Sequence, residues 1–193
     1  MFDCAIASNP RKLSSIAMSK LLEYCFIIFS VFQSFEGCEG IVENQDQFCS
    51  YADYEIYRTI INKELGKSDY LIVLRDSTSG MHIDSSSVKY IKERMPDLLN
   101  LTIYDFIQKN KFSSKLKKIP GINNLILESE YTGNYKHTVR VTFSRVGYDN
   151  SHLQSIVSMS EVYGPLAGSG TLFFLKKENR EWEIKNTLLI WIS

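Results

Sequence analysis

Apolar residues recur every three or four positions between residues 50 and 66, which predicts an amphipathic helix. Ser50 and Asp53 stand three residues apart at its start, like a capping box with the shorter acid, and Gly66 is a natural stop. The apolar positions share one helical face, which we expect to be buried: Ile56, Tyr57, Ile60, Ile61 and Leu65.

Two shorter helices are predicted next. Residues 76–87 are rich in Ser, Thr, Gly and Asp and read as turns. The apolar positions of 88–95 then suggest a helix that halts at Pro96, because proline lacks the N–H that a helix interior requires. A third helix follows, with Thr102 and Asp105 as a second candidate capping box.

After residue 124 the hydrophobic period changes to two, which predicts strands. An earlier run of branched residues over 70–74 also reads as a buried strand. In the last strand five apolar residues lie on one parity, with Asn186 breaking the pattern, so we expect one apolar face: Trp182, Ile184, Leu188, Ile190 and Ile192. The later strands are predicted at 125–127, 138–144, 155–162, 171–177 and 182–192.

Short turns between alternating strands predict hairpins, and helices followed by a run of strands are typical of an α+β protein. We therefore expect N-terminal helices packed on a curved, four- to five-stranded antiparallel meander. This order of elements is similar to the cone-shaped NTF2-like and cystatin-like folds. The similarity is architectural and implies no function by itself, because such folds host many.

Composition narrows the class of partner. The 193 residues carry 22 Lys and Arg and 22 Asp and Glu, so the formal net charge is zero. The chain has no block of basic residues that could neutralise the phosphates of a nucleic acid, which argues against nucleic acid as a partner. Hydrophobic residues make up 44% and aromatic residues 12%, so the chain can bury a core, and disorder or a polytopic membrane protein is not expected.

The N-terminal segment has the layout of an export signal. From Met18 it reads as a short basic start, an apolar stretch and then small residues, with cleavage after Gly40. Alternatively, Cys38 would be lipidated at a loose lipoprotein junction. The predicted organisation is an over-extended start at 1–17, a signal peptide or lipoprotein leader at 18–40, a linker at 41–50 and a single globular α+β domain at 51–193.

This layout predicts a protein exported to the periplasm, the cell envelope or the medium. It would touch a membrane only through its leader or a lipid anchor. The alternative is a cytoplasmic protein in which residues 20–35 form a buried core helix. That run carries Glu23 and Gln33 and falls short of the roughly 18 clean apolar residues of a membrane span.

No motif points to catalysis, a metal or a cofactor. The four cysteines all precede residue 50 with gaps too wide for a zinc cluster, and the three histidines show no helical i, i+4 pairing. No G-x-S-x-G elbow is present. The glycines of 164–170 precede a strand pattern instead of the helix that a phosphate cradle requires, so they read as a turn.

Four residues are candidates for binding, each with a structural alternative. Arg145 continues the parity of an apolar strand face and could contact an anion in a cavity, together with Tyr148 and Tyr163. It could equally form a structural ion pair or emerge where the sheet ends. Asp76 follows a buried strand and could line a pocket mouth, or accept hydrogen bonds from the next turn.

The C-terminal half resembles a family of uncharacterised exported bacterial proteins. The matching features are a strand ending in S-R-V-G-aromatic (143–148), a Gly-rich hairpin (164–170), the strand 172–177, the tryptophan-bearing close at 181–182 and 191–193, and the opening at 53–57. The resemblance implies an exported α+β domain without an established activity. In that family the hairpin can hold cysteines near the positions of Tyr163 and Ala167. This chain has no cysteine there, so any thiol chemistry of the family hairpin is absent here.

An export signal without a catalytic constellation favours a non-enzymatic domain that binds a small ligand or an envelope protein, or that has a structural role. The alternative is an NTF2-like pocket enzyme, a hydrolase or isomerase acting on a small molecule through an acid such as Asp76 with Arg145. A deep polar cavity would favour the enzyme, whereas an interior filled by Phe and Trp would remove it.

Overall fold

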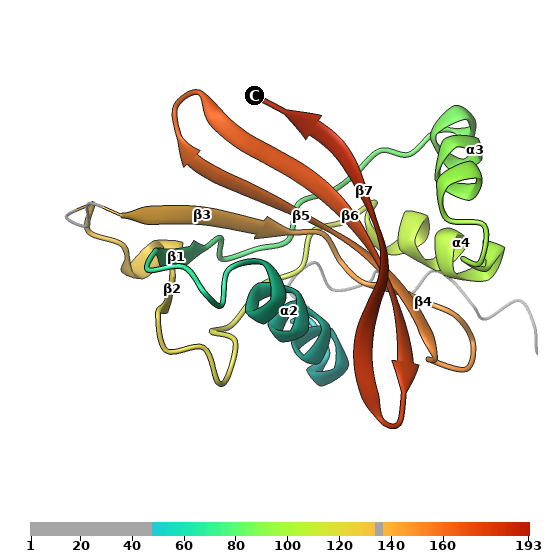
Figure 1. The fold of residues 1–193 in the computed structure, drawn as a ribbon, viewed down its shortest axis with the longest axis horizontal. Coiled ribbons are helices and arrows are strands. Elements are labelled where there is room, and N and C mark those ends of the chain that lie inside the picture. The colour runs from blue at the N-terminus through green and yellow to red at the C-terminus, as the bar shows by residue number, and fades with distance from the viewer. Residues whose placement is uncertain (1–47, 134–136) are drawn as a thin grey trace, which may run out of the picture. The chain divides into compact units, whose positions relative to one another are not determined.

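The computed structural model describes residues 48–133 and 137–193. This part of the chain contains three α-helices and seven strands (Figure 1). These elements belong to one compact unit. The predicted start, the leader with Cys38, and the linker up to residue 47 lie outside the described residues. No helix in 48–133 or 137–193 is long and apolar enough to cross a membrane.

Helix α2 (Tyr51–Glu64) begins where the sequence predicts. The Ser50 hydroxyl accepts the Asp53 N–H at 3.3 Å, and the Asp53 carboxylate accepts the Ser50 N–H at 2.9 Å, which completes the capping box. Leu65 is the C-cap and Gly66 follows it, as expected. The predicted apolar face is fully buried, so the helix packs against the sheet along its length.

The next two helices are α3 (Ser85–Arg94) and α4 (Asn100–Lys109). Asp84 caps α3, and Pro96 follows its C-cap as predicted. The second predicted capping box was wrong, because α4 begins after Leu99 and Thr102 already lies inside the helix, fully buried. Asp105 instead forms an ion pair with Lys109 at 2.7 Å.

The seven strands form one sheet. In sheet order the path is β2-β1-β3-β5-β6-β7, and β4 pairs with β5 off this path. A short 3₁₀ helix, η1 (Glu128–Glu130), follows β2. The strand bounds are β1 Leu71–Leu74, β2 Leu125–Leu127, β3 Thr138–Phe143, β4 Gly147–Tyr148, β5 Gln154–Gly164, β6 Ala167–Glu178 and β7 Glu181–Ile192.

The fold class is α+β as predicted, but the sheet is mixed and not an antiparallel meander of four or five strands. β1 pairs in parallel with both of its neighbours, with Ile72 opposite Leu125 on one side and Val139 on the other. Parallel pairing requires a long crossover connection, and the segment with α3 and α4 provides one between β1 and β2. β3, β5, β6 and β7 pair in antiparallel order, as expected.

Strand β7 does not keep the single apolar parity that the sequence suggested. Its register with β6 shifts between Ile184 and Asn186, and again near Ile190. One extra residue moves every later side chain of a strand to the opposite face. Trp182 and Ile184 therefore pack on the α2 side of the sheet, whereas Leu188 packs on the other side.

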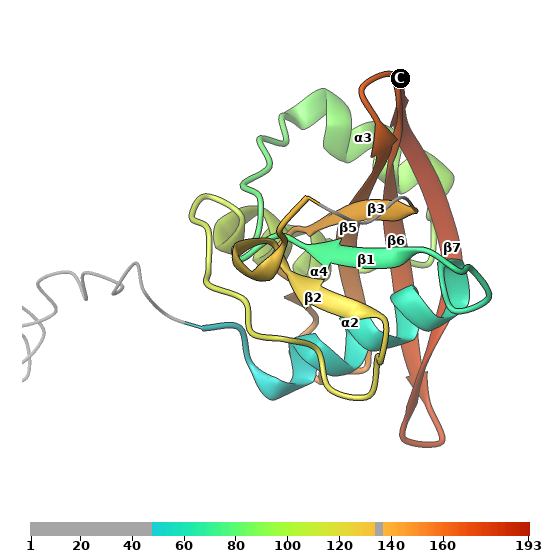
Figure 2. The same ribbon diagram turned by 90° about the vertical axis from the view of Figure 1, so that its left-hand side faces the viewer.

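Helices cover both faces of the sheet, α2 on one and α3 with α4 on the other (Figure 2). Each face carries its own hydrophobic cluster. The largest side chains on the α2 side are Tyr57, Phe143, Phe173 and Trp182, and those on the α3 and α4 side are Phe106, Phe174, Leu172 and Met95.

A buried hydrogen bond joins α2 to β4. The Tyr148 hydroxyl donates to the Asp53 carboxylate at 2.8 Å, and the Tyr148 N–H donates to Asp105 of α4 at 2.8 Å. Burial, reinforced by the Asp53 charge, raises the pKa of Tyr148 well above its ordinary value. One turn further along α2, the Tyr57 hydroxyl donates to the Ser144 carbonyl at 2.9 Å. These bonds fix both helix layers to the same edge of the sheet.

We expect Tyr148→Phe to lower the free energy of unfolding by about 1–3 kcal/mol, because the buried Asp53 carboxylate loses a donor. Tyr51→Phe is the matched control: its side chain is 74% exposed, so the change should stay within about 0.5 kcal/mol. Urea unfolding followed by circular dichroism measures both. Equal effects of the two substitutions would contradict the proposed role of the bond.

The two-residue turn between β6 and β7 yields a second prediction. Asn179 and Arg180 have φ values of 52° and 71°, the pattern of a type I′ hairpin turn, which favours glycine. Arg180→Gly should therefore raise the free energy of unfolding by about 1 kcal/mol. Asn179→Gly should gain less, because asparagine adopts this conformation more readily. If Arg180→Gly instead lowered the free energy of unfolding, the Arg180 side chain would stabilise the fold by more than its positive φ destabilises it.

Candidate functional site

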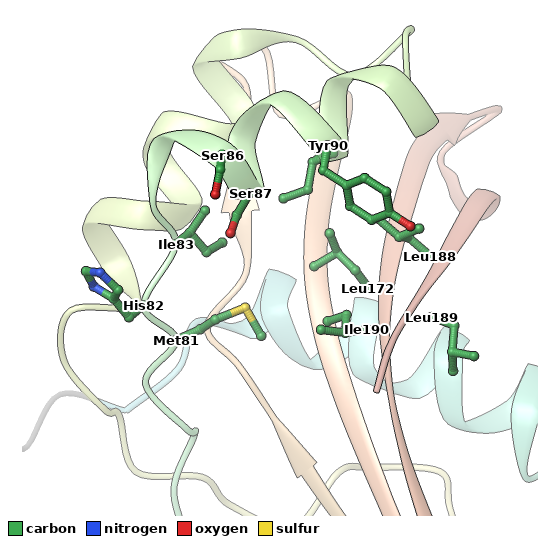
Figure 3. Close-up of a pocket in the computed structure, with 11 residues that line it drawn as sticks. Met81, His82, Ile83, Ser86, Ser87, Tyr90, Leu172, Leu188, Leu189 and Ile190 are labelled. Atoms are coloured by element: carbon green, nitrogen blue, oxygen red, sulfur yellow. The ribbon is translucent and has the colours of Figure 1, made fainter. Parts of the chain in front are cut away.

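A groove of about 430 Å³ lies between α3 and the strands β6 and β7 (Figure 3). Its walls come from the loop before α3, from one face of α3, and from the paired strands. The residues that line it are Met81, His82, Ile83, Ser86, Ser87, Tyr90, Ile91, Leu172, Leu188, Leu189 and Ile190.

The groove has an aliphatic floor and a partly exposed rim. Leu172 of β6 and Leu188 of β7 are directly paired, so their side chains stand side by side below α3. Ile91 of α3 is buried against them. Tyr90 and Ile190 form part of the rim and are each about half exposed. An apolar ligand could therefore contact the floor while its outer end stays near solvent.

The two serine side chains that line the groove bond the residue that caps α3. The Asp84 carboxylate accepts the Ser87 N–H and the Ser86 hydroxyl, both at 2.8 Å, and the Ser87 hydroxyl at 2.7 Å. These bonds, those from Ser87 first, lower the pKa of Asp84 to about 2. The cap therefore stays charged at neutral pH and holds both serine hydroxyls that line the groove.

The lining of the groove is mainly aliphatic. Among the described residues that line it there is no carboxylate, thiol, lysine or arginine, and His82 supplies an imidazole. General acid–base catalysis needs groups that can exchange protons with the substrate, and nucleophilic catalysis needs an activated nucleophile. The two serine hydroxyls donate to the Asp84 carboxylate, which is a weak base because its pKa is lowered to about 2.

The structure places Arg145 beyond the end of β3 and only half-buried. Asn110 holds its backbone on both sides: the Arg145 N–H donates to the Asn110 side chain at 2.8 Å, and the Asn110 amide donates to the Arg145 carbonyl at 2.9 Å. The guanidinium reaches the Lys109 carbonyl at 3.5 Å. These contacts correspond to the structural alternative, an arginine that emerges where the strand ends.

Tyr148 borders a separate cleft of about 510 Å³, whose polar groups are engaged with one another. The Lys109 ammonium lies 4.9 Å from the Tyr148 ring centroid and pairs with Asp105. His152 stacks on Tyr148 with centroids 4.8 Å apart. Asp149 accepts the N–H groups of the following turn, so this cleft is held together by structural contacts.

The other two candidates lie elsewhere. Tyr163 packs edge-on against Tyr70, with ring centroids 5.3 Å apart, and its hydroxyl bonds Glu161. Asp76 accepts the Ser129 N–H at 3.1 Å and the Ser129 hydroxyl at 2.9 Å. The four residues that the sequence singled out therefore do not line one cavity together.

The Gly-rich segment forms a hairpin, as the sequence suggested. β5 ends at Gly164 and β6 resumes at Ala167. Gly170 leaves room for Trp191: a Cβ there would lie 2.0 Å from the indole nitrogen. Within 48–133 and 137–193, no group of three His, Cys, Asp or Glu side chains could hold a metal ion.

Cys49 is free and buried, and its sulfur lies 3.7 Å from the Tyr57 hydroxyl. Burial, and then the charge of Asp53, raises the pKa of Cys49 to about 11. Because thiolate is the reactive form, this thiol is not activated as a nucleophile. The raised pKa also means that the thiol favours folding below pH 9 and that this contribution is lost as the pH rises towards 11.

We expect Cys49 to react with iodoacetamide at pH 8 at least tenfold more slowly in the native protein than in guanidinium chloride. Peptide mapping by mass spectrometry follows Cys49 separately from the other cysteines. The same peptide in the unfolded chain is the control. Equal native and unfolded rates would show that the thiol is accessible.

The fold and the groove define an α+β protein with a mixed sheet and a ligand-sized apolar groove. No protein-family model, no curated protein and no solved structure matches the chain significantly.

The sequence offered a weak signal for the groove. Met81 and Ile83 stand in a segment that reads as turns, and two isolated apolar residues do not predict a wall. The stronger signal was at the C-terminal end, where residues 188–192 are apolar on both parities. Such a strand places apolar side chains on both faces of the sheet. Both faces must then be covered by other elements, or one of them stays exposed.

Proposed function

We propose that this protein is a non-enzymatic binding module that holds an uncharged apolar chain in the groove between α3 and β7. The observation that supports the proposal is the lining: an aliphatic floor with no charged side chain, apart from His82 when it is protonated. An anionic or cationic head group would find no opposite charge there, whereas a methylene chain would find contact on both sides.

The size of the groove is consistent with a small ligand. About 430 Å³ lies within the usual range of ligand pockets. Each buried methylene contributes about 0.8 kcal/mol, close to a fourfold gain in affinity. Affinity should therefore increase with chain length until the groove is full.

The interior of the α2 layer supports a non-enzymatic role over the pocket enzyme. Tyr57 stacks on Phe143 with ring centroids 4.4 Å apart, and Phe173 and Trp182 belong to the same cluster. In an NTF2-like or cystatin-like cone, a ligand cavity would lie between the helix and the sheet in this layer. Aromatic side chains occupy it here.

Export remains part of the proposal. The layout of residues 18–40 supports a leader that is cleaved after Gly40 or lipidated at Cys38. A module that holds an apolar chain would then work at the cell envelope or outside the cell. The alternative address is the cytoplasm, and cell fractionation distinguishes the two.

Titration calorimetry with 1-hexanol, 1-octanol and 1-decanol tests the proposal. We expect Kd to fall about fourfold for each added methylene, and 1-octanol to bind more tightly than octanoate because the described residues that line the groove include no lysine and no arginine. Tyr90→Ser removes a rim residue and should weaken binding about tenfold.

Lys89→Ser is the matched control, since it alters the adjacent residue of α3 outside the groove. Its Kd should equal that of the wild type. A Kd that does not change with the length of the alcohol, or an equal loss of affinity in the two variants, would contradict an apolar-chain site in this groove.

A further inference from the structure

β7 is the edge strand at one end of the sheet, and β2 lies at the other end. Among the described strands β7 pairs with β6 only, so the backbone groups of its outer side face no described strand. Such an edge is a template for pairing with another strand, and natural proteins usually protect it with charges, proline or a covering segment. The protection along β7 is uneven.

Charged residues protect the first half of β7. Lys185 lies there and pairs with Glu178 at 2.7 Å and with Glu183 at 2.8 Å. The second half, Thr187–Ile192, carries no charge and no proline. An uncharged, β-prone run of six residues on an exposed edge is a segment that pairs readily with its own kind.

An apolar patch surrounds this second half. Gly168 and Ser193 exchange backbone hydrogen bonds at 2.9 and 3.3 Å, which brings the tip of the β5–β6 hairpin beside the end of β7 (Figure 1). Leu166 at that tip is 87% exposed, and Ile192 is 72% exposed. The patch consists of Leu166, Leu189, Ile190, Trp191 and Ile192.

The area of the patch suits a small, stable interface. With large side chains contributing ~150–250 Å² each when fully exposed, these fractional exposures amount to roughly 600 Å² per copy. Two such patches reach about 1,200 Å², the lower end of the range for specific interfaces.

We propose that β7 is the interface between two copies of this chain, with Thr187–Ile192 of each copy paired in antiparallel fashion across a two-fold axis. A strand and its own copy are self-complementary in this arrangement, and pairing the two copies uses the β7 edge of each, so neither β7 edge remains free. A lipid surface fits less well, because the patch has no Lys or Arg and because lipid cannot satisfy the backbone groups of the edge. The proposal does not depend on a ligand in the groove.

Sedimentation velocity of the full chain over a range of concentrations tests the pairing. We expect a dimer that dissociates on dilution, and at least tenfold weaker association in Leu189→Lys, because each copy would carry a lysine charge in the middle of the paired segment. Leu153→Lys is the matched control: Leu153 lies outside the patch and is 53% exposed, against 51% for Leu189. This variant should associate like the wild type.

Hydrogen exchange supplies a second measurement that does not rely on the variants. Amides of 187–192 should become more protected as the wild-type concentration rises, and this rise should be lost in Leu189→Lys. A wild type that stays monomeric, an open-ended aggregate, equal behaviour of the two lysine variants, or protection independent of concentration would each overturn the proposal. The last result would show that another segment of the same chain covers the edge.

Discussion

The position of α2 on the sheet depends on the buried carboxylate of Asp53. It caps its own helix through Ser50 and accepts the Tyr148 hydroxyl from β4. A carboxylate this buried is tolerated only when hydrogen bonds replace the water that it has lost. The bonds from Ser50 and Tyr148 do so, and they set the distance at which Tyr57 stacks on Phe143. Burial in the α2 layer, and then the charge of Asp53, raises the pKa of Cys49.

The other face of the sheet is governed by a mismatch of lengths. α3 and α4 have ten residues each, about 15 Å of helix, whereas β6 and β7 have twelve residues each, about 40 Å of strand. Neither helix can cover these strands from end to end. The uncovered length includes the apolar end of β7. It adjoins the groove that α3 forms with the strands, and Leu189 and Ile190 belong to both the proposed ligand site and the proposed interface.

Local features could be predicted from the sequence, because they depend on residues close together in the chain. The Ser50–Asp53 capping box, the stop at Pro96 and the hairpin at 164–170 were confirmed. The parallel pairing of β1 could not be predicted, since its partners lie more than 50 residues away and nothing in Leu71–Leu74 specifies them. The Thr102–Asp105 pattern failed because α4 begins three residues earlier than a cap at Thr102 allows.

Arguments from parity hold only while a strand continues without a bulge. Arg145 was assigned to an inward face by counting from Val139, but β3 ends at Phe143, and the chain has left the pleat before it reaches the arginine. In β7 the two register shifts move apolar residues to both faces, which a strict period of two does not anticipate. The run of five apolar residues at 188–192 is the sequence signature of this behaviour. Within this run Leu188 packs below α3, whereas Ile192 stays exposed at the edge, where another strand can cover it.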